Sequence, residues 1–582
     1  MKIKHLFGLA VIAAMSASCS SNEDLGTAGP GTGTNETGVG YATFTINLPS
    51  VSGTRAADAG GAEMNEGTPE EYAVKSATAL IFQKYGSDEG SYKFVESVTL
   101  PIDGWTNDPT DGITTTSKKL VAKLTNVDTK NDYSVLILLN NTKVNLPTVG
   151  QSYNDWNSKN ILTPLVTDWA GSDGFYMANA PLKGSAASPA ILVPIDKGKI
   201  YASETEANDP AKDCAATVYV ERGVAKMSVT DPTPTDPIKV KDKATKAETE
   251  STVKFNNWAL DITNKKTYAV HNIDGLSADY AEIWEPTGRF FGTNGRVYWG
   301  KDPNYSMPEL KDANLAGDTK RSEEFNSITN IDDINKTFDK PVYCLENTFD
   351  LANMYQGQTT RVIFKATYAP KDAAGNNLAE TADGTFYTIG NMTDILNETK
   401  LKAAVDAAAT SVLPGCAVDY DANLKKEGSH VITLEDIKEN SSSTTHLEGT
   451  ATYGADLKTG DKIVAEINDK LGLKAGRPEE MVGINTYLKG VTYYIARVKH
   501  FGDALTHWNS GESYGTKNKE YLGRYGMLRN NWYELQVGNV YGPGYPGVPP
   551  VDPTLPDDEN EKYLSVSVKI LSWAKRSDTV DL

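Results

Sequence analysis

Residues 561–582 read EKYLSVSVKILSWAKRSDTVDL, a strand-like segment at the far end of the sequence. Its apolar side chains alternate with small or charged ones, which is the period-two pattern of a strand with one buried face. Before it stands GPGYPGVPPVDPTLPDD, a proline-rich stretch typical of an extended linker. An apolar strand at a chain end invites pairing with another chain, because its backbone has an open edge. The apolar face consists of Leu564, Val566, Val568 and Ile570.

A second alternating strand lies near the N-terminus, after a Gly/Thr-rich spacer at residues 26–40. It spans residues 41–48 and ends at Pro49. The two strands share one pattern, so both could suit the same groove in a β-sheet. Alternation is common in any β protein, and that is the simpler explanation. The apolar positions are Ala42, Phe44, Ile46 and Leu48.

Arg55 is the only lysine or arginine between Lys4 and Lys75. The residues around it are mostly Gly, Ala, Thr and acidic, so we expect a segment flexible enough to enter a protease. Cutting the Arg55–Ala56 bond would detach the strand at residues 41–48 from the remaining chain. A surface arginine without such a role is the alternative.

The first residues form an export signal. Lys2 and Lys4 precede an apolar run, residues 6–15, that is too short to span a bilayer as a helix. Small residues then lead to Cys19 and SSNED. This segment resembles the lipobox of bacterial lipoproteins, with Ser16 where leucine is usual, and SSNED resembles the tags that direct Bacteroidetes lipoproteins to the outer face of the outer membrane. We therefore expect a lipid on Cys19, and the alternative is secretory cleavage beside an incidental cysteine.

The composition narrows the class of protein. A chain of 582 residues is too long for one core, so two or more domains are expected. The 29 tyrosines, with frequent Thr and Val, favour strands. The net charge of −19 argues against nucleic acid and anionic lipid as partners.

Strand patterns continue along the chain, with a hairpin at residues 73–100 and further strands at 118–127 and 132–141. The segment 216–229 is expected to end the first domain, because a Pro/Thr/Lys/Asp-rich stretch follows it. Helical spacing appears only near residues 398–413 and 459–473. The prediction is an all-β protein with two sandwich-like domains in series, a few helical insertions in the second, and a free C-terminal strand.

Enzymatic and metal-binding motifs are weak. The three cysteines after Cys19 are widely spaced without a CxxC, so they form either one bridge or buried thiols. No HExxH or P-loop occurs, the acidic loops do not match an EF-hand, and we predict no metal, no cofactor and no enzymatic activity. The sequence GESYG matches GxSxG but has polar flanks. An enzyme would use the acidic, histidine and serine residues Asp332, Asp333, Asp419, Asp421, His500, His507 and Ser513. A glycan-binding protein would use tryptophans such as Trp105, Trp156, Trp169 and Trp508. The remaining cysteines are Cys214, Cys344 and Cys416.

Together these segments resemble the shaft fimbrillins of Bacteroidetes type V pili, in particular the minor (short) fimbrium subunit group. The resemblance rests on the lipoprotein signal, the arginine segment and the terminal strand described above. Three internal segments complete it, and their order along the chain is more specific than any one of them. They are MANAPLKG at 177–184, VERGVAKMSV at 220–229 and GMLRNNWYELQVGNVYGPGYP at 526–546.

The resemblance implies transthyretin-like β-sandwich domains and assembly by donor-strand exchange. Residues 41–48 would be the leaving strand, Arg55–Ala56 the scissile bond, and the strand from Leu564 the donor. In the strand alternation, Trp573 falls on the face opposite to Leu564, Val566, Val568 and Ile570. A bulge or strand end is therefore expected near Leu571, and Trp573 would cover the rim of the groove. The implied segments are a signal peptide at 1–19, a propeptide at 20–55, domains at 56–235 and 236–541, a linker at 542–561 and the donor strand at 562–582.

The implied partners are copies of the chain, head-to-tail in a filament, and accessory anchor and tip pilins. An arginine-specific or trypsin-like protease would cut the precursor, and host or bacterial surface ligands would follow from adhesion, aggregation or biofilm formation. The implied location is the outer membrane surface and then an extracellular fimbria. A pilus anchor subunit and a lipid-anchored glycan-binding lipoprotein are the alternatives.

Overall fold

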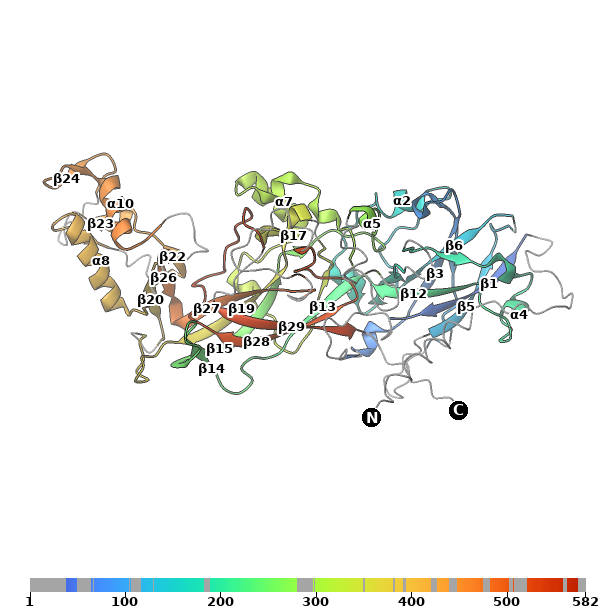
Figure 1. The fold of residues 1–582 in the computed structure, drawn as a ribbon, viewed down its shortest axis with the longest axis horizontal. Helices are drawn as coiled ribbons and strands as arrows, with labels where there is room; N and C mark the ends of the chain where they lie inside the picture. Colours follow the sequence, from blue (N-terminus) through green and yellow to red (C-terminus); the bar gives the residue numbers. More distant parts are fainter. Residues whose placement is uncertain are drawn as a thin grey trace.

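A computed structural model gives an elongated molecule with a β-sheet unit at one end, a second in the middle and a helical lobe at the other end (Figure 1). The residues it describes are 38–49, 64–65, 67–103, 105, 117–128, 130–182, 189–279, 297, 299–348, 351–379, 383–390, 394–419, 426–438, 447–474, 482–501, 506, 521–557 and 563–573. Strands dominate these residues, which confirms the predicted all-β class.

The first unit is one large sheet in the order β11-β1-β12-β9-β6-β3-β4, with β5 added to β1 and β10 to β6. β6 carries an unbroken apolar run, and all seven of its residues are buried, as expected of a central strand covered on both faces. The strands are β1 (Gly40–Asn47), β3 (Ala77–Gln83), β4 (Lys93–Thr99), β5 (Ser117–Leu124), β6 (Tyr133–Leu139), β9 (Met177–Asn179), β10 (Val193–Ile195), β11 (Ile200–Tyr201) and β12 (Ala216–Arg222).

The second unit is a sandwich of two sheets, ordered β18-β13-β28-β29-β2 and β14-β15-β19-β27. Alternate residues of both sheets meet in one core, where Trp258 and Phe364 from one sheet pack with Met227 and Leu535 from the other. The strands are β2 (Met64–Asn65), β13 (Val224–Val229), β14 (Ile238–Lys241), β15 (Glu248–Asp261), β18 (Val342–Leu345), β19 (Arg361–Ala369), β27 (Val491–Arg497), β28 (Trp532–Val540) and β29 (Leu564–Trp573).

The chain passes between the units at Gly223, earlier than the proline-rich stretch suggested. β12 belongs to the first sheet and β13 to the second, so residues 216–229 are not both strands of the first domain. Gly223 permits the crossing, because a Cβ there would stand 2.6 Å from the Trp169 ring. An apolar alternation runs through both strands, so the sequence alone does not reveal the change of sheet.

The two predicted helices are confirmed and form a lobe of their own. α8 (Glu398–Val412) and α10 (Gly460–Lys470) begin at Asn397 and Thr459, whose side chains accept hydrogen bonds from the third residue beyond. Their apolar faces pack with the sheet β20-β26-β22 in a separate core. Its strands are β20 (Phe386–Ile389), β22 (Gly428–His430) and β26 (Ile484–Tyr487).

Short elements fill the connections. The helices are α2 (Tyr153–Trp156), α3 (Val166–Trp169), α4 (Glu204–Ala207), α5 (Leu276–Asp279) and α7 (Leu315–Glu324). The two-residue strands are β7 (Ala170–Gly171), β8 (Gly174–Phe175), β16 (Thr263–Asn264), β17 (Phe325–Asn326), β21 (Ala417–Val418), β23 (Ile437–Lys438), β24 (Thr452–Tyr453) and β25 (Lys458–Thr459). In the described residues, no helix is long and apolar enough to cross a membrane.

Glu89 makes the stability of the first unit depend on pH. Its carboxylate accepts hydrogen bonds from the backbone of Ile191 at 3.0 Å and Leu192 at 2.8 Å, while burial raises its pKa from 4.5 to about 7. Between pH 4.5 and about pH 7, Glu89 keeps its proton in the folded state but has lost it in the unfolded state. The free energy of unfolding therefore falls as the pH rises through this range.

We expect this loss to be of order 2 kcal/mol, since one pKa unit corresponds to about 1.4 kcal/mol. Urea unfolding from pH 4.5 to 7 would measure it, and Glu89→Gln should flatten the dependence. The exposed Glu204 supplies the control Glu204→Gln, which should leave the slope unchanged. An unchanged slope in Glu89→Gln would show that another group titrates.

Candidate functional site

β1, the predicted leaving strand, lies inside the first sheet. It pairs antiparallel with β5 over all eight of its residues. On its other side its second half pairs parallel with β12, and its start pairs with β11. Removing β1 would therefore leave a slot with unpaired backbone on both sides, which a strand of similar length could fill.

The predicted inward side chains of β1 are all in the core. Ala42, Phe44 and Ile46 have 0% exposure and Leu48 has 1%. Thr43 points to the other side but is also buried, and its hydroxyl donates to the Ala207 carbonyl at 2.7 Å. The slot therefore has an apolar floor and one buried hydrogen-bond acceptor opposite it.

The processing residues lie outside the described residues: Cys19, Arg55 and Ala56. The chain passes from β1 through Arg55 to β2, so a cut there would leave β1 attached to the body by non-covalent contacts alone. β2 itself pairs in parallel with the last residues of β29, Ser572 and Trp573.

β29 exists where the donor strand was predicted, but the expectation that it is free is wrong. It pairs antiparallel with β28, from Leu564–Val540 to Leu571–Trp532. Leu564 is 2% exposed, and Val566 and Val568 pack against the second core. The apolar face of β29 thus finds partners on its own chain, because β28 would otherwise present an open edge.

The pairing of β29 with β28 ends at Leu571, near the position where a bulge or strand end was expected, and β29 then continues against β2 as far as Trp573. Ile570 pairs with Tyr533 of β28, and Trp573 with Asn65 of β2. The register shift lies instead in β28, at Gly538. A Cβ on Gly538 would stand 3.1 Å from the Ser565 hydroxyl, so glycine accommodates the bulge.

The proline-rich linker, described as far as residue 557, is packed onto the second unit and does not act as a loose tether. The hydroxyls of Tyr494 and Tyr487 donate to the carbonyls of Gly542 and Gly544 at 2.8 and 3.0 Å. Arg361 donates to the Pro549 carbonyl at 2.6 Å. A proline-rich chain offers carbonyls but few N–H groups, so side-chain donors can hold it without a strand partner.

A buried ion pair joins the two units next to the segment that leads from Arg55. η3 (Pro69–Glu71) ends in Glu71, whose carboxylate lies 2.8 Å from Lys226 Nζ of β13 and 2.5 Å from the Tyr343 hydroxyl of β18. Glu71 is 0% exposed. Arg222 also donates to the Glu71 carbonyl at 3.0 Å and to Asn530 at 3.2 Å. We call Glu71, Lys226, Tyr343, Arg222 and Asn530 the joint.

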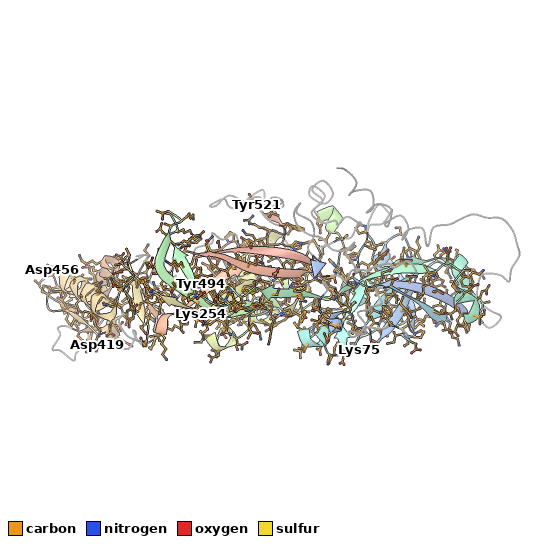
Figure 2. All side chains as sticks on the ribbon, turned by 90° about the horizontal axis from the view of Figure 1, so that it is seen from below. Lys75, Lys254, Asp419, Asp456, Tyr494 and Tyr521 are labelled. Atoms are coloured by element: carbon orange, nitrogen blue, oxygen red, sulfur yellow. The ribbon has the colours of Figure 1, made fainter. Side chains whose placement is uncertain are left out.

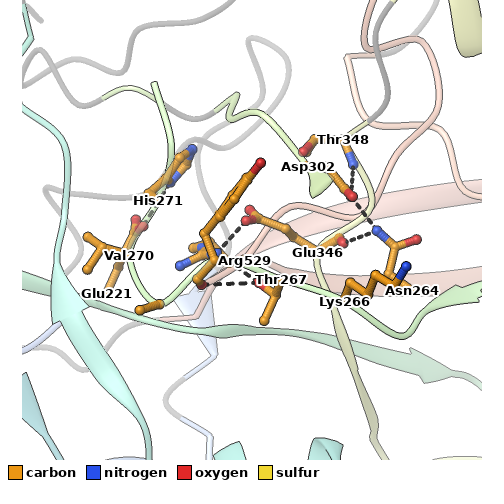
Figure 3. A network of polar contacts seen from close by, with 12 residues as sticks. Glu221, Asn264, Lys266, Thr267, Val270, His271, Asp302, Glu346, Thr348 and Arg529 are labelled. Carbon is orange, nitrogen blue, oxygen red and sulfur yellow. Dashed lines mark hydrogen bonds and ion pairs between the residues drawn. The ribbon is translucent and has the colours of Figure 1, made fainter. Parts of the chain in front are cut away.

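Figure 3 shows a second polar network, whose Glu221 and Arg529 are the chain neighbours of Arg222 and Asn530 in the joint. His271 Nδ1 lies 2.8 Å from a carboxylate oxygen of Glu221, which accepts a hydrogen bond in the imidazole tautomer that carries its proton on Nδ1. Arg529 contacts Glu346 and Thr267, and all three side chains are buried. The segments VERGVAKMSV and RNNWYE therefore each contribute residues to both networks. Their role in joining the units was not predicted. The available signal was the set of charged and amide residues within strand patterns.

The enzyme candidates that lie within the described part of the chain do not come together in one site. His500 is buried with Nδ1 2.8 Å from the Tyr533 hydroxyl, and Asp332 and Asp333 are exposed on one turn. Asp419 lies in the helical lobe, far from Lys75 in the first unit, and pairs with Lys438 at 2.6 Å (Figure 2). Asp421, His507 and Ser513 lie outside the described residues. In the part of the chain that the structure describes, no cluster of potential metal ligands occurs.

The tryptophans and cysteines are structural where they are described. Trp105, Trp156 and Trp169 lie in the first core, so the idea that they are open stacking platforms is wrong; Trp508 lies outside the described residues. Cys214, Cys344 and Cys416 are buried free thiols. Burial raises the pKa of the Cys344 thiol to about 12 and that of Cys416 to about 11, so neither is reactive near neutral pH.

Comparisons with known proteins concern the C-terminal part of the chain most directly. Two solved structures from Parabacteroides distasonis are similar: a candidate cell adhesion protein (10% identity, TM-score 0.38, 92% of this chain and 98% of the other) and a fimbrial assembly protein (12%, 0.26, 61% and 93%). At these scores neither likeness carries an argument. No curated protein matches the sequence.

A family model does match: the major fimbrial subunit protein type IV, fimbrillin, C-terminal, over residues 485–579. The match covers β27, β28, the packed linker and β29, which are the elements that carry the predicted donor strand. By this match, the C-terminal region of the chain is similar to the C-terminal part of fimbrillins, which are fimbrial subunits.

Proposed function

We propose that the protein is a structural shaft subunit of a surface fimbria, assembled by protease-triggered strand exchange between copies. The observation that carries the proposal is β1, a fully paired inner strand linked to the body only through the segment containing Arg55. The fimbrillin C-terminal match supports the same class of protein. In this proposal β29 of a neighbouring copy fills the slot that β1 vacates.

The energetics favour such an exchange. The slot holds four buried apolar side chains, and β29 carries four at the same spacing, each contributing on the order of 1.5–3 kcal/mol on burial. Donor and acceptor are different surfaces of one chain, so the contact is head-to-tail and produces an open filament. An uncut subunit keeps β1 covalently attached at high effective concentration and stays monomeric.

The docked position of β29 adds a second requirement. To reach a neighbour, β29 must leave β28 and give up the burial of Leu564. Residues 558–562 between the packed linker and β29 extend over at most about 17 Å. A longer reach requires the linker to separate from Tyr494, Tyr487 and Arg361 as well. Exchange therefore replaces contacts within the chain by contacts between chains, and the vacated slot supplies the gain.

The remaining parts of the proposal concern export and partners. A lipid on Cys19 would hold the precursor at the outer membrane until an arginine-specific or trypsin-like protease cuts after Arg55. The mature subunit would then join an extracellular filament with anchor and tip pilins and serve adhesion. No cofactor and no catalytic activity belong to this function.

The variant Arg55→Ala tests the proposal. We expect the surface protein to keep its N-terminal segment and to form no filaments, whereas wild type starts at Ala56 and assembles. Intact mass, N-terminal sequencing and negative-stain microscopy of cells would measure both. Lys75→Ala is the control, because Lys75 is the next basic residue along the chain and is exposed; it should assemble like wild type.

Filaments built by Arg55→Ala would contradict the mechanism. Wild-type material that starts only at a lipidated Cys19 would indicate an anchor subunit or a glycan-binding lipoprotein instead.

A further inference from the structure

β1 and β29 are similar position by position, beyond their shared alternation. Residues 41–48 read YATFTINL and residues 563–570 read YLSVSVKI. Read in the same direction, each apolar residue meets an apolar residue, each Thr meets a Ser, and Asn47 meets Lys569. Tyr41 meets Tyr563 at the start of both segments. The bulk gained where Leu564 replaces Ala42 is offset by two valines in place of larger residues.

The environment of Thr43 distinguishes this alignment from others. Thr43 is 5% exposed, and its hydroxyl donates to the Ala207 carbonyl of α4 at 2.7 Å. Its own carbonyl accepts from the Ala215 backbone at 2.8 Å, so the backbone at this position is fixed as well. An incoming strand must therefore place a small hydroxyl there or leave a buried carbonyl without its donor.

The opposite direction fails at this position. If β29 entered reversed, with Ile570 in the place of Ala42, Lys569 would take the place of Thr43. A lysine ammonium would then occupy a position that is only 5% exposed for Thr43, and burying a charge there is costly. A same-direction shift by two residues brings Ser567 to Thr43, but it also puts Ser572 in the place of Leu48 on the apolar floor.

We infer that β29 of a neighbouring copy enters the slot in the direction of β1, with Ser565 in the place of Thr43 and donating to Ala207. This rests on the proposed function and specifies its register. On its own chain the Ser565 hydroxyl instead accepts from the Asn539 backbone at 2.9 Å, beside the bulge at Gly538. Ser565 therefore has a defined polar partner in the docked state and in the exchanged state.

Disulfide trapping in filaments tests the register. Asn47 stands opposite Ser117 of β5, so Lys569 would stand there in the inferred register. Directly opposite residues in an antiparallel pair are close enough for a disulfide after small adjustment. Filaments of Lys569→Cys/Ser117→Cys should therefore give covalent ladders on non-reducing gels. The single variants and Ser565→Cys/Ser117→Cys should run as monomers.

A ladder from Ser565→Cys/Ser117→Cys would show the reversed direction and overturn the inference while leaving strand exchange intact. Filaments that yield no ladder from either pair would overturn the register. If a double variant does not assemble, cleaved Ser117→Cys protein mixed with a peptide of residues 561–573 carrying Cys at 569 should form the mixed disulfide. If the peptide with Cys at 569 forms no disulfide with Cys at position 117 but a peptide with Cys at 565 does, β29 enters the slot in the reversed direction. Absence of filaments from wild type would instead contradict the proposed function itself.

Discussion

Replacing Glu71 with alanine is expected to lower the free energy of unfolding by about 3–5 kcal/mol, because it removes one partner of a buried ion pair. Lys226, 1% exposed, would keep its charge in the interior, and the Tyr343 hydroxyl would lose its acceptor. Urea unfolding followed by tryptophan fluorescence would measure the change. We also expect faster proteolysis between the two units, since the joint is a direct link between them.

The neighbouring residue provides a matched control. Glu70 carries the same side chain on the same turn but is exposed, so Glu70→Ala should change the free energy by less than about 0.5 kcal/mol. The double variant Glu71→Ala/Lys226→Met should lose less than Glu71→Ala alone, since no unpaired charge remains. Equal losses in Glu70→Ala and Glu71→Ala would show that the joint does not hold the units together.

Phe44→Ala is expected to destabilise the uncut precursor by about 3–5 kcal/mol, the usual cost of removing a fully buried phenylalanine. Under the proposed exchange, the same change should have no effect on the mature filament, because β1 would no longer be part of the subunit. Thermal unfolding of the precursor before cleavage, and of filaments after it, would give the two values.

Thr45→Ala on the same strand is the control for this comparison. Its side chain is only half-buried, so the precursor should lose less than about 1 kcal/mol. A penalty for Phe44→Ala that persists in filaments would mean that β1 stays in its slot after cleavage. That result would contradict strand exchange even if filaments formed.

The joint would also hold the two units of a subunit together when a filament is pulled along its length. Glu71 lies shortly after the segment that contains Arg55. Its carboxylate contacts β13 and β18 of the second unit, and its carbonyl accepts a hydrogen bond from Arg222 of β12 in the first unit. Cleavage after Arg55 therefore leaves the new N-terminal part of the chain anchored at Glu71. Under the proposed exchange, each subunit would keep its two units in one arrangement while the strands at its ends change partners.

Local patterns in the sequence determined much of this protein. The alternation of β1 and β29, the buried run of β6 and the spacing and caps of α8 and α10 each predicted an element that the structure contains. These features depend on neighbours a few residues away, so a single sequence is enough to predict them. The overall all-β class follows from the same local preferences.

The tertiary structure alone decided how these elements combine. The transfer of β13 to the second sheet, the docking of β29 on β28 and the packing of the linker against Tyr494 and Arg361 were all missed or predicted differently. The joint is the clearest case, since Glu71 and Lys226 are 155 residues apart. Such contacts depend on which surfaces meet after folding, and residues far apart in one sequence carry no local signal of their pairing.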